Sequence, residues 1–228
     1  YIVYTICLKN TAKRMRRILV ANPKGGCGKS TLSTHIAAWF AWQEYAVMLG
    51  DIDRQHSSHR WLDLRPKQLP HIGRWELDDD KIARPPKGTQ VVVLDTPAGL
   101  HGKTLKQVLA QVDKVIVPVL PSAFDMWASA SFFDELAEMK AVRREAVEVG
   151  IVGMRINART QAAAQLQPFL EQYELPLLTT IRDTQLYVQT IQRGMTMGIV
   201  NAGALGLKWE RRREAMGDAE ARARSQSG

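Results

Sequence analysis

Short apolar runs recur along the chain and are separated by polar, glycine-containing or amphipathic segments. A run of this length, bounded by turn-forming residues, is typical of a strand buried on both faces. The run Val91–Leu94, which ends at Asp95, is apolar throughout and predicts a central parallel strand. The expected strands are Arg17–Ala21, Ala46–Asp51, Val91–Leu94, Lys114–Val119, Gly150–Ile156 and Leu177–Ile181.

Helical spacing appears between these strands. Leu32, Ile36, Trp39 and Phe40 fall on one face of a helix after the first strand, at i, i+4, i+7 and i+8. Further helices are expected at Ser58–Leu64, Ser129–Val142 and Gln161–Tyr173. Strands that alternate with helices predict βαβ units, and therefore an α/β fold with a mostly parallel central sheet flanked by helices.

The chain divides into three regions by charge and periodicity. Residues 1–16 form a basic arm, residues 17–200 carry the alternating pattern, and residues 201–228 form a charged tail. The formal net charge is +8, from 31 basic and 23 acidic residues. The first 17 residues hold five basic residues and no acid, so most of this excess comes from that segment, and Met15 is an alternative start. Charge therefore only supports a polyanionic partner. We expect the tail to be a solvated helix or an unstructured segment.

Several classes of protein are disfavoured by composition. No apolar run approaches the ~20 residues of a membrane helix, and the apolar N-terminal stretch precedes its basic residues, opposite to a secretory signal. Cys7 and Cys27 form neither a metal-binding spacing nor a disulfide framework. We therefore expect a cytoplasmic protein.

A glycine-rich loop with two lysines lies between the first strand and the first helix. Glycines allow consecutive N–H groups to face phosphate oxygens, and the helix N-terminus adds partial positive charge. Lys29 would reach the β- and γ-phosphates, the Ser30 hydroxyl would bind Mg²⁺, and Thr31 would bind the α-phosphate. Pro23 replaces the first glycine of the usual phosphate-loop pattern. The predicted nucleotide-binding residues are Lys24, Gly25, Gly26, Cys27, Gly28, Lys29, Ser30 and Thr31.

Acidic residues follow two of the expected strands. Asp51 and Asp53 follow the second strand, and Asp95 ends the Val91–Leu94 run. A single strand-end aspartate often only caps the next helix. Three motifs in order, each after an apolar strand, favour a shared site instead.

These motifs resemble those of the ParA/MinD family of ATPases. The loop from Lys24 resembles its deviant Walker A motif, Asp51–Gln55 resembles its D-x-D-P-Q segment with Arg54 in place of proline, and Asp95–Pro97 resembles its Walker B motif. The resemblance continues through Asp113–Ser122 and more faintly to Arg182–Gly194, and covers roughly residues 17–195.

The resemblance implies roles for individual residues. Lys24 would cross a dimer interface to the partner's nucleotide, Asp53 would orient the attacking water, and Lys29 would complete the catalytic set. Asp51 would support Mg²⁺ or its waters, and Asp95 would hold Mg²⁺ through water. Asn157 either lies near the adenine or caps a loop. ATP and Mg²⁺ are the implied cofactors.

The expected function is a partition or positioning ATPase. ATP would drive homodimerisation, the dimer would bind DNA non-specifically on the nucleoid, and a ParB-like adaptor or cargo protein would stimulate hydrolysis. Candidate DNA-binding arginines are Arg143, Arg144, Arg155, Arg159, Arg182 and Arg193.

Three alternatives stay open. A membrane-cycling ATPase of the MinD type would need an amphipathic C-terminal helix, which the tail from Glu210 does not offer. A reductase like the nitrogenase iron protein would need paired cysteines. A nucleotide-binding scaffold without turnover is disfavoured by the intact Lys29, Ser30, Asp53 and Asp95.

Overall fold

The computed structural model describes residues 15–75, 84–144 and 146–197. Nearly all of the basic arm and the whole charged tail lie outside the described residues, as do residues 76–83. The proposed boundaries at residues 16 and 200 therefore stay predictions.

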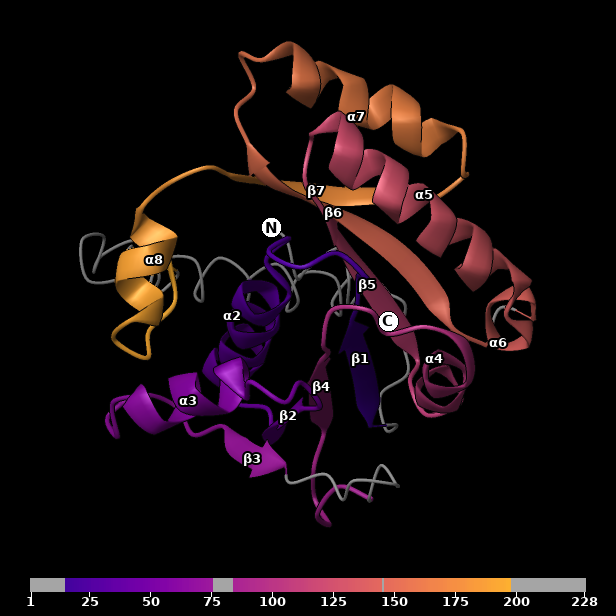
Figure 1. Cartoon of the computed structure of the whole chain (residues 1–228). Helices are drawn as coiled ribbons and strands as arrows, with labels where there is room; N and C mark the ends of the chain where they lie inside the picture. Colours follow the sequence, from indigo (N-terminus) through magenta and orange to yellow (C-terminus); the bar gives the residue numbers. More distant parts are fainter. Residues whose placement is uncertain (1–14, 76–83, 145, 198–228) are drawn as a thin grey trace, which may run out of the picture.

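Seven parallel strands form one sheet, in the order β3-β2-β4-β1-β5-β6-β7 (Figure 1). This confirms the expected parallel α/β architecture. The strands are β1 (Arg16–Val20), β2 (Val47–Asp51), β3 (Gly73–Trp75), β4 (Val91–Asp95), β5 (Lys114–Val119), β6 (Glu148–Ile156) and β7 (Leu177–Arg182). All six expected strands are present, and β3 is an additional short strand at one edge.

Helices cover both faces of the sheet (Figure 1). One face carries α2 (Lys29–Trp42), α3 (Ser57–Leu64) and α8 (Leu186–Ile191). The other carries α4 (Gly102–Leu109), α5 (Ala123–Glu138), α6 (Lys140–Arg143) and α7 (Gln161–Glu171). The apolar pattern did not reveal α4 or α8, which have only eight and six residues.

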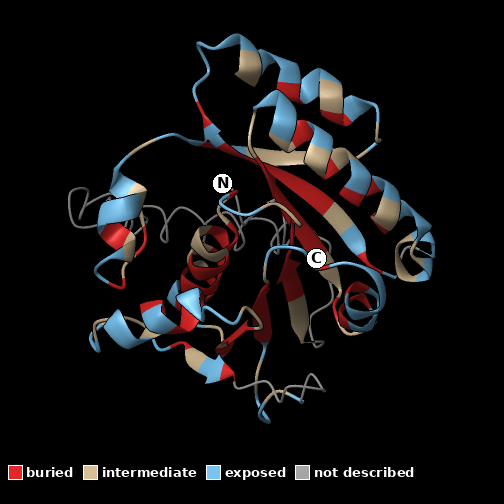
Figure 2. Cartoon of the chain, viewed as in Figure 1, coloured by how far each residue is buried: buried red, intermediate tan, exposed pale blue. Residues whose placement is uncertain are grey.

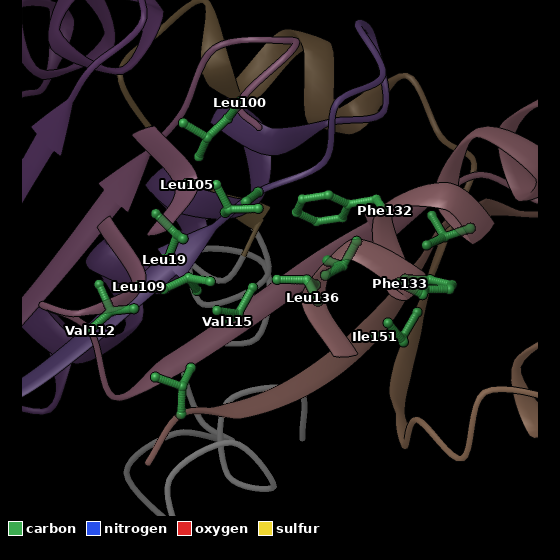
Figure 3. Packing of buried hydrophobic residues seen from close by; sticks show 14 of the residues in the cluster. Leu19, Leu100, Leu105, Leu109, Val112, Val115, Phe132, Phe133, Leu136 and Ile151 are labelled. Carbon is green, nitrogen blue, oxygen red and sulfur yellow. The ribbon is translucent and has the colours of Figure 1, made fainter. Parts of the chain in front are cut away.

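The central strands are buried on both faces (Figure 2). Along β1, Ile18 and Val20 pack on the side of α2, whereas Leu19 packs on the side of α4. Figure 3 shows Leu19 close to Leu105 of α4 and Val115 of β5. Because both faces are covered, these strands are continuous apolar runs without a polar alternate face.

The prediction of a helix at Ser129–Val142 was wrong at both ends. α5 begins six residues earlier, because the Ser122 hydroxyl accepts a hydrogen bond from the Asp125 N–H (3.2 Å) and caps the helix. Met139 has an extended backbone with ψ 128°, which ends α5 and separates it from α6.

The β6–β7 pairing is less regular than the central ones. Its register shifts between Ile151 and Val152 and again between Gly153 and Ile156. Arg155 lies at the second shift with φ 51°, in the left-handed region that a non-glycine residue rarely adopts. The end of β6 is therefore bent away from ideal strand geometry.

In the described ranges, no helix combines the length and apolar character required to cross a bilayer.

Candidate functional site

The predicted acidic residues and the glycine-rich loop meet at the carboxyl ends of the central strands. β4 pairs with β1 and with β2, and the register places Asp95 beside Val20 on one side and Asp51 on the other. The loop from Pro23 to Gly28 follows β1 directly and leads into α2. The carboxyl edge of a parallel sheet is where α/β proteins commonly bind ligands.

Asn22 anchors the beginning of the loop. Its side-chain amide donates to the Pro118 carbonyl (2.8 Å) and to the Ser129 hydroxyl (3.1 Å), and its Oδ1 accepts from the Lys24 N–H (2.9 Å). Asn22 is 1% exposed, so these bonds satisfy a buried amide. The sequence analysis missed this residue, although a polar residue that directly follows an apolar strand was a usable signal.

Two glycines shape the loop through left-handed backbone conformations. Gly26 has φ 75° and Gly28 has φ 94°. A Cβ on Gly28 would lie 2.7 Å from the Met154 Cε, so β6 approaches the loop at this point. α2 begins at Lys29, and no side chain caps its N-terminus. The first N–H groups of this helix therefore suit a bound anion, and the glycine cradle fits a phosphate group.

The two lysines of the loop are placed in opposite ways. Lys29 is 7% exposed, and its Nζ donates to the Lys24 carbonyl oxygen at 2.9 Å. The Lys24 side chain is 42% exposed, and its Nζ lies 3.6 Å from the Asp125 Oδ1 at the start of α5. Lys29 thus faces into its own loop, whereas Lys24 reaches the protein surface.

Cys27 fills the loop interior. Its thiol is buried and lies 3.3 Å from the Lys24 carbonyl oxygen. Burial raises the pKa of the Cys27 thiol, so the group stays protonated and unreactive at neutral pH. This placement agrees with a small filler at the variable position of the loop.

Asp95 is the most enclosed carboxylate of the site. It is 0% exposed, and its oxygens accept hydrogen bonds from the hydroxyls of Ser58 (2.6 Å) and Ser33 (3.3 Å). Burial raises the pKa of Asp95 to about 6, and hydrogen bonds from Ser30, Ser58 and Ser33 oppose this rise. The Ser30 hydroxyl and Asp95 are therefore neighbours, as a shared Mg²⁺ site would require.

Asp51 serves first as a capping group for α3. Its Oδ1 accepts from the Asp53 N–H (2.9 Å), and its Oδ2 accepts from the N–H groups of Ser58 (2.8 Å) and His59 (3.4 Å). A cap of the next helix is the common role of an aspartate at the end of a strand. These hydrogen bonds also fix the positions of Asp53 and Ser58 relative to the site. A role of Asp51 in Mg²⁺ binding stays a prediction. Because both of its oxygens already accept backbone hydrogen bonds, Asp51 is better suited to position its neighbours than to contact the metal.

Asp53 is half-buried, and its Oδ1 accepts from the Gln55 N–H (3.0 Å). Arg54 is exposed beside it. The Asp53 carboxylate thus lies at the open side of the site, where a water molecule has access. Its role in hydrolysis stays a prediction.

The far end of α3 is fixed to the last described segment of the chain. Gly194 has φ 64°, and a Cβ there would lie 2.4 Å from the backbone of Leu64. The Trp61 indole N–H donates to the Met195 carbonyl (3.2 Å). On the neighbouring helix α2, His35 Nε2 accepts from the Met197 N–H (3.2 Å). Residues 194–197 therefore contact both helices that begin at the site.

Asn157 forms a turn after β6. It is exposed, and its Oδ1 accepts from the Arg159 N–H (3.2 Å). Of the two readings open in the sequence, this geometry favours the loop cap. The Gly28–Met154 approach nevertheless brings the end of β6 to the phosphate loop.

The donor set fits magnesium better than a metal held by protein side chains alone. In the parts of the chain that the structure describes, no three His, Cys, Asp or Glu side chains gather as a metal cage. Mg²⁺ commonly binds through one or two carboxylates and phosphate oxygens and keeps several waters. Ser30 in the phosphate loop and the neighbouring, buried Asp95 match that pattern.

Comparison with known proteins identifies the family of this domain. Residues 18–197 match the CobQ/CobB/MinD/ParA nucleotide binding domain. Maintenance of carboxysome distribution protein A of Halothiobacillus neapolitanus is 31% identical over 197 residues, covering 83% of this chain and 88% of that protein. The chromosome-partitioning ATPase Soj of Thermus thermophilus is 26% identical over 187 residues, covering 68% and 75%.

Solved structures share the fold at low identity. A McdA–ATP complex from Cyanothece has a TM-score of 0.65 at 14% identity, covering 90% of this chain and 98% of that one. A plasmid partition protein of Borrelia burgdorferi bound to AMPPNP has a TM-score of 0.62 at 18% identity, covering 81% and 91%. Together with the motifs and the sheet topology, these comparisons show that the chain belongs to the ParA/MinD family of nucleotide-binding ATPase domains.

Proposed function

We propose that this chain is an ATP-switched positioning ATPase, which dimerises with ATP, binds DNA non-specifically as a dimer and is reset by hydrolysis. The observation that carries the proposal is the opposite placement of two lysines in one phosphate loop. Lys29 lies inside the loop at 7% exposure, whereas the Lys24 side chain is 42% exposed. A nucleotide in the loop already has one lysine from its own chain, so an outward lysine is suited to a nucleotide on a second chain.

ATP and Mg²⁺ would be held by the residues of the loop and of β4. Lys29 would exchange the Lys24 carbonyl for phosphate oxygens, and Ser30 with Asp95 would hold Mg²⁺. When bound, Mg²⁺ neutralises charge on the phosphates during phosphoryl transfer. Asp53 would orient the attacking water from the open side of the site. A trans lysine would complete the charge neutralisation, so hydrolysis would stay slow in the monomer.

The relatives support cargo positioning as the general purpose. Their names associate them with carboxysome distribution, chromosome partitioning and plasmid partition. The same type of ATPase domain therefore occurs in proteins that are named for different cargoes. We propose a ParB-like or cargo-bound adaptor that stimulates hydrolysis by this chain, and a cytoplasmic, nucleoid-associated location.

Exposed arginines at the carboxyl ends of β6 and β7 support DNA binding. Arg155 and Arg182 lie in neighbouring strands, since Ile156 pairs with Arg182, and both are exposed. Arg159 and Arg193 are also exposed and lie on the segments that follow these strands. We propose that these four arginines contact phosphate groups.

The remaining two candidates lie elsewhere. Arg143 and Arg144 lie before the start of β6, whereas Arg155 lies near its end. The part of β6 from Glu148 to Arg155 is about 23 Å long at ~3.3 Å per residue. They are therefore suited to serve as a control pair on the same molecule.

The proposal is tested by DNA binding and turnover of purified protein. The Asp53→Ala chain should bind duplex DNA with ATP–Mg²⁺ and not with ADP, and its logarithmic affinity should fall with logarithmic salt by about 0.9 per neutralised phosphate. Arg155→Ala with Arg182→Ala should weaken binding and reduce this slope by about 2, whereas Arg143→Ala with Arg144→Ala should not. DNA binding that is independent of nucleotide would contradict the switch.

A further inference from the structure

Two aromatic side chains stand out from the first turns of α5. Phe124 is 73% exposed and Trp127 is 63% exposed, and their rings meet edge to face with centroids 5.5 Å apart. We call this pair the aromatic patch. Within the described ranges, other exposed large hydrophobic residues such as Leu64 (56%) and Trp42 (46%) lie on different helices.

The fold does not need the aromatic patch for packing. α5 packs on the sheet through its opposite face, where Met126, Ser129 and Phe133 are buried. Phe124 and Trp127 make no part of either buried apolar cluster. A Trp beside a Phe is costly to expose to water, and such residues are enriched where proteins bind each other.

The aromatic patch lies beside the outward lysine of the phosphate loop. Asp125, between the two aromatic residues in sequence, lies 3.6 Å from the Lys24 Nζ. Lys24 and the patch therefore belong to one surface at the carboxyl edge of the sheet. Any partner that Lys24 reaches would also meet the patch.

The charge on this surface favours a second copy of the chain over a nucleic acid. The patch is flanked by one cation, Lys24, and one anion, Asp125. A two-fold dimer presents the same surface from both subunits, so a surface with both signs is complementary to itself. A phosphate backbone would instead meet the Asp125 carboxylate next to the aromatic rings.

We propose that Phe124 and Trp127 form the apolar contact between two copies of this chain, next to Lys24. The proposal rests on the ATP-bound dimer proposed above and names the side chains that would hold it together. Asp125 keeps Lys24 on its own subunit in the monomer, and the patch supplies the contact that replaces this ion pair in the dimer.

The test measures the dimer dissociation constant by sedimentation equilibrium with ATP–Mg²⁺, in full-length chains that carry Asp53→Ala. Phe124→Ala with Trp127→Ala should weaken dimerisation by about 30-fold or more, the range of a buried aromatic anchor. Leu64→Ala with Trp42→Ala is the matched control, because it removes exposed apolar side chains from other helices and should leave the constant within about twofold. Thermal melting and ATP affinity at low protein concentration should match the parent, which shows that the variant is folded and binds nucleotide.

The outcomes separate the two proposals. If the parent dimerises and the patch variant does so with the same constant, the patch proposal is overturned while the dimer stands. The same holds if the patch variant dimerises normally but loses binding to DNA or to a partner protein. If the Asp53→Ala parent stays monomeric with ATP, the proposed dimer itself fails, and the patch proposal fails with it.

Discussion

The pairings of β4 with β1 and β2 run in unbroken register, whereas the pairing of β6 with β7 shifts twice within a few residues. The central strands are also buried on both faces, while β7 is largely half-exposed. Asp51 and Asp95 lie directly opposite each other in the regular region. Asn157 and the proposed DNA-binding arginines lie in the irregular one.

On the proposed function, this difference corresponds to a division of tasks. Groups that position phosphate and metal need fixed geometry, which fully paired and buried strands supply. Contacts to a DNA backbone tolerate a more variable surface, because they depend on charge more than on exact position. Gly28 against Met154, and Gly194 against α3, are two of the points where the irregular region contacts the regular one.

The largest effect is expected in the regular region. Lys29→Ala should lower ATP affinity by about 100-fold or more, because it removes a buried ammonium from the phosphate loop. Calorimetric titration with ATP–Mg²⁺ measures the change. Lys24→Ala should leave the affinity of the monomer within a few-fold, and equal losses in the two variants would contradict their different placement.

The contact between the irregular region and α3 is probed by a glycine pair. Gly194→Ala should lower the free energy of unfolding by about 3 kcal/mol, because it adds a Cβ against backbone atoms in a left-handed conformation. Gly102→Ala has a similar φ of 59° against 64° but an open surrounding, so it should cost about 1 kcal/mol. Urea denaturation at pH 7 compares the free energies of unfolding of the two variants. Equal losses would mean that Gly194 does not pack closely against the end of α3.

The pH dependence of magnesium binding tests the enclosure of Asp95. Its pKa is raised to about 6, so the carboxyl is neutral below that pH and attracts Mg²⁺ only above it. The gain in ATP affinity from Mg²⁺ should therefore fall about tenfold between pH 7 and pH 5. Asp95→Asn should reduce the pH dependence of this gain to the part that comes from protonation of the ATP phosphate itself. A variant with the same pH dependence as the wild type would argue against Asp95 at the metal.

The raised pKa of Asp95 also makes the free energy of unfolding depend on pH. The folded pKa lies above the unfolded value of 3.8, so the native chain binds more protons between pH 3.8 and about 6. The stability that protonated Asp95 contributes is present below pH 3.8 and is lost as the pH rises through 6. Asp95→Asn should therefore raise the melting temperature at pH 7 more than at pH 4 in thermal scans without nucleotide.

The smallest effect concerns the ion pair that holds Lys24. Asp125→Asn should strengthen ATP-dependent dimerisation two- to fivefold, because an ion pair with one exposed partner contributes about 1 kcal/mol or less. Sedimentation with the Asp53→Ala background resolves the change. A weaker dimer would instead mean that Asp125 stabilises the dimer interface, and that this effect outweighs the ion pair that it forms with Lys24 in the monomer.

The regular region was the part that the sequence could predict best. β5 was predicted with its exact ends, and β1, β2 and β4 to within a residue, because strands buried on both faces leave continuous apolar runs. The loop between β1 and α2 was predicted because its glycines and lysines have a strict order. The structure places the Ser30 hydroxyl beside Asp95, and the roles of Lys29, Ser30 and Asp95 in binding ATP and Mg²⁺ stay predictions.

The missed features depend on single contacts or on short elements. β3 and α8 are too short to show a period, and α5 begins early because one Ser122 hydroxyl caps it. Ser58 is a buried polar residue whose partner Asp95 comes from another element, so no local pattern marks it. Asn22 was marked only by its place directly after an apolar strand. The exposed Phe124 and Trp127 also broke the helical pattern, which is why the start of α5 was placed too late.

The most direct test of the account is the mass of the Asp53→Ala chain by light scattering, with and without ATP–Mg²⁺. The account predicts a monomer of 25.6 kDa that doubles in mass only with ATP, and a Lys24→Ala version that stays monomeric under the same conditions. A mass that ATP does not change, or a dimer that forms equally well without Lys24, would contradict the claim that the outward lysine makes this domain an ATP-dependent dimer.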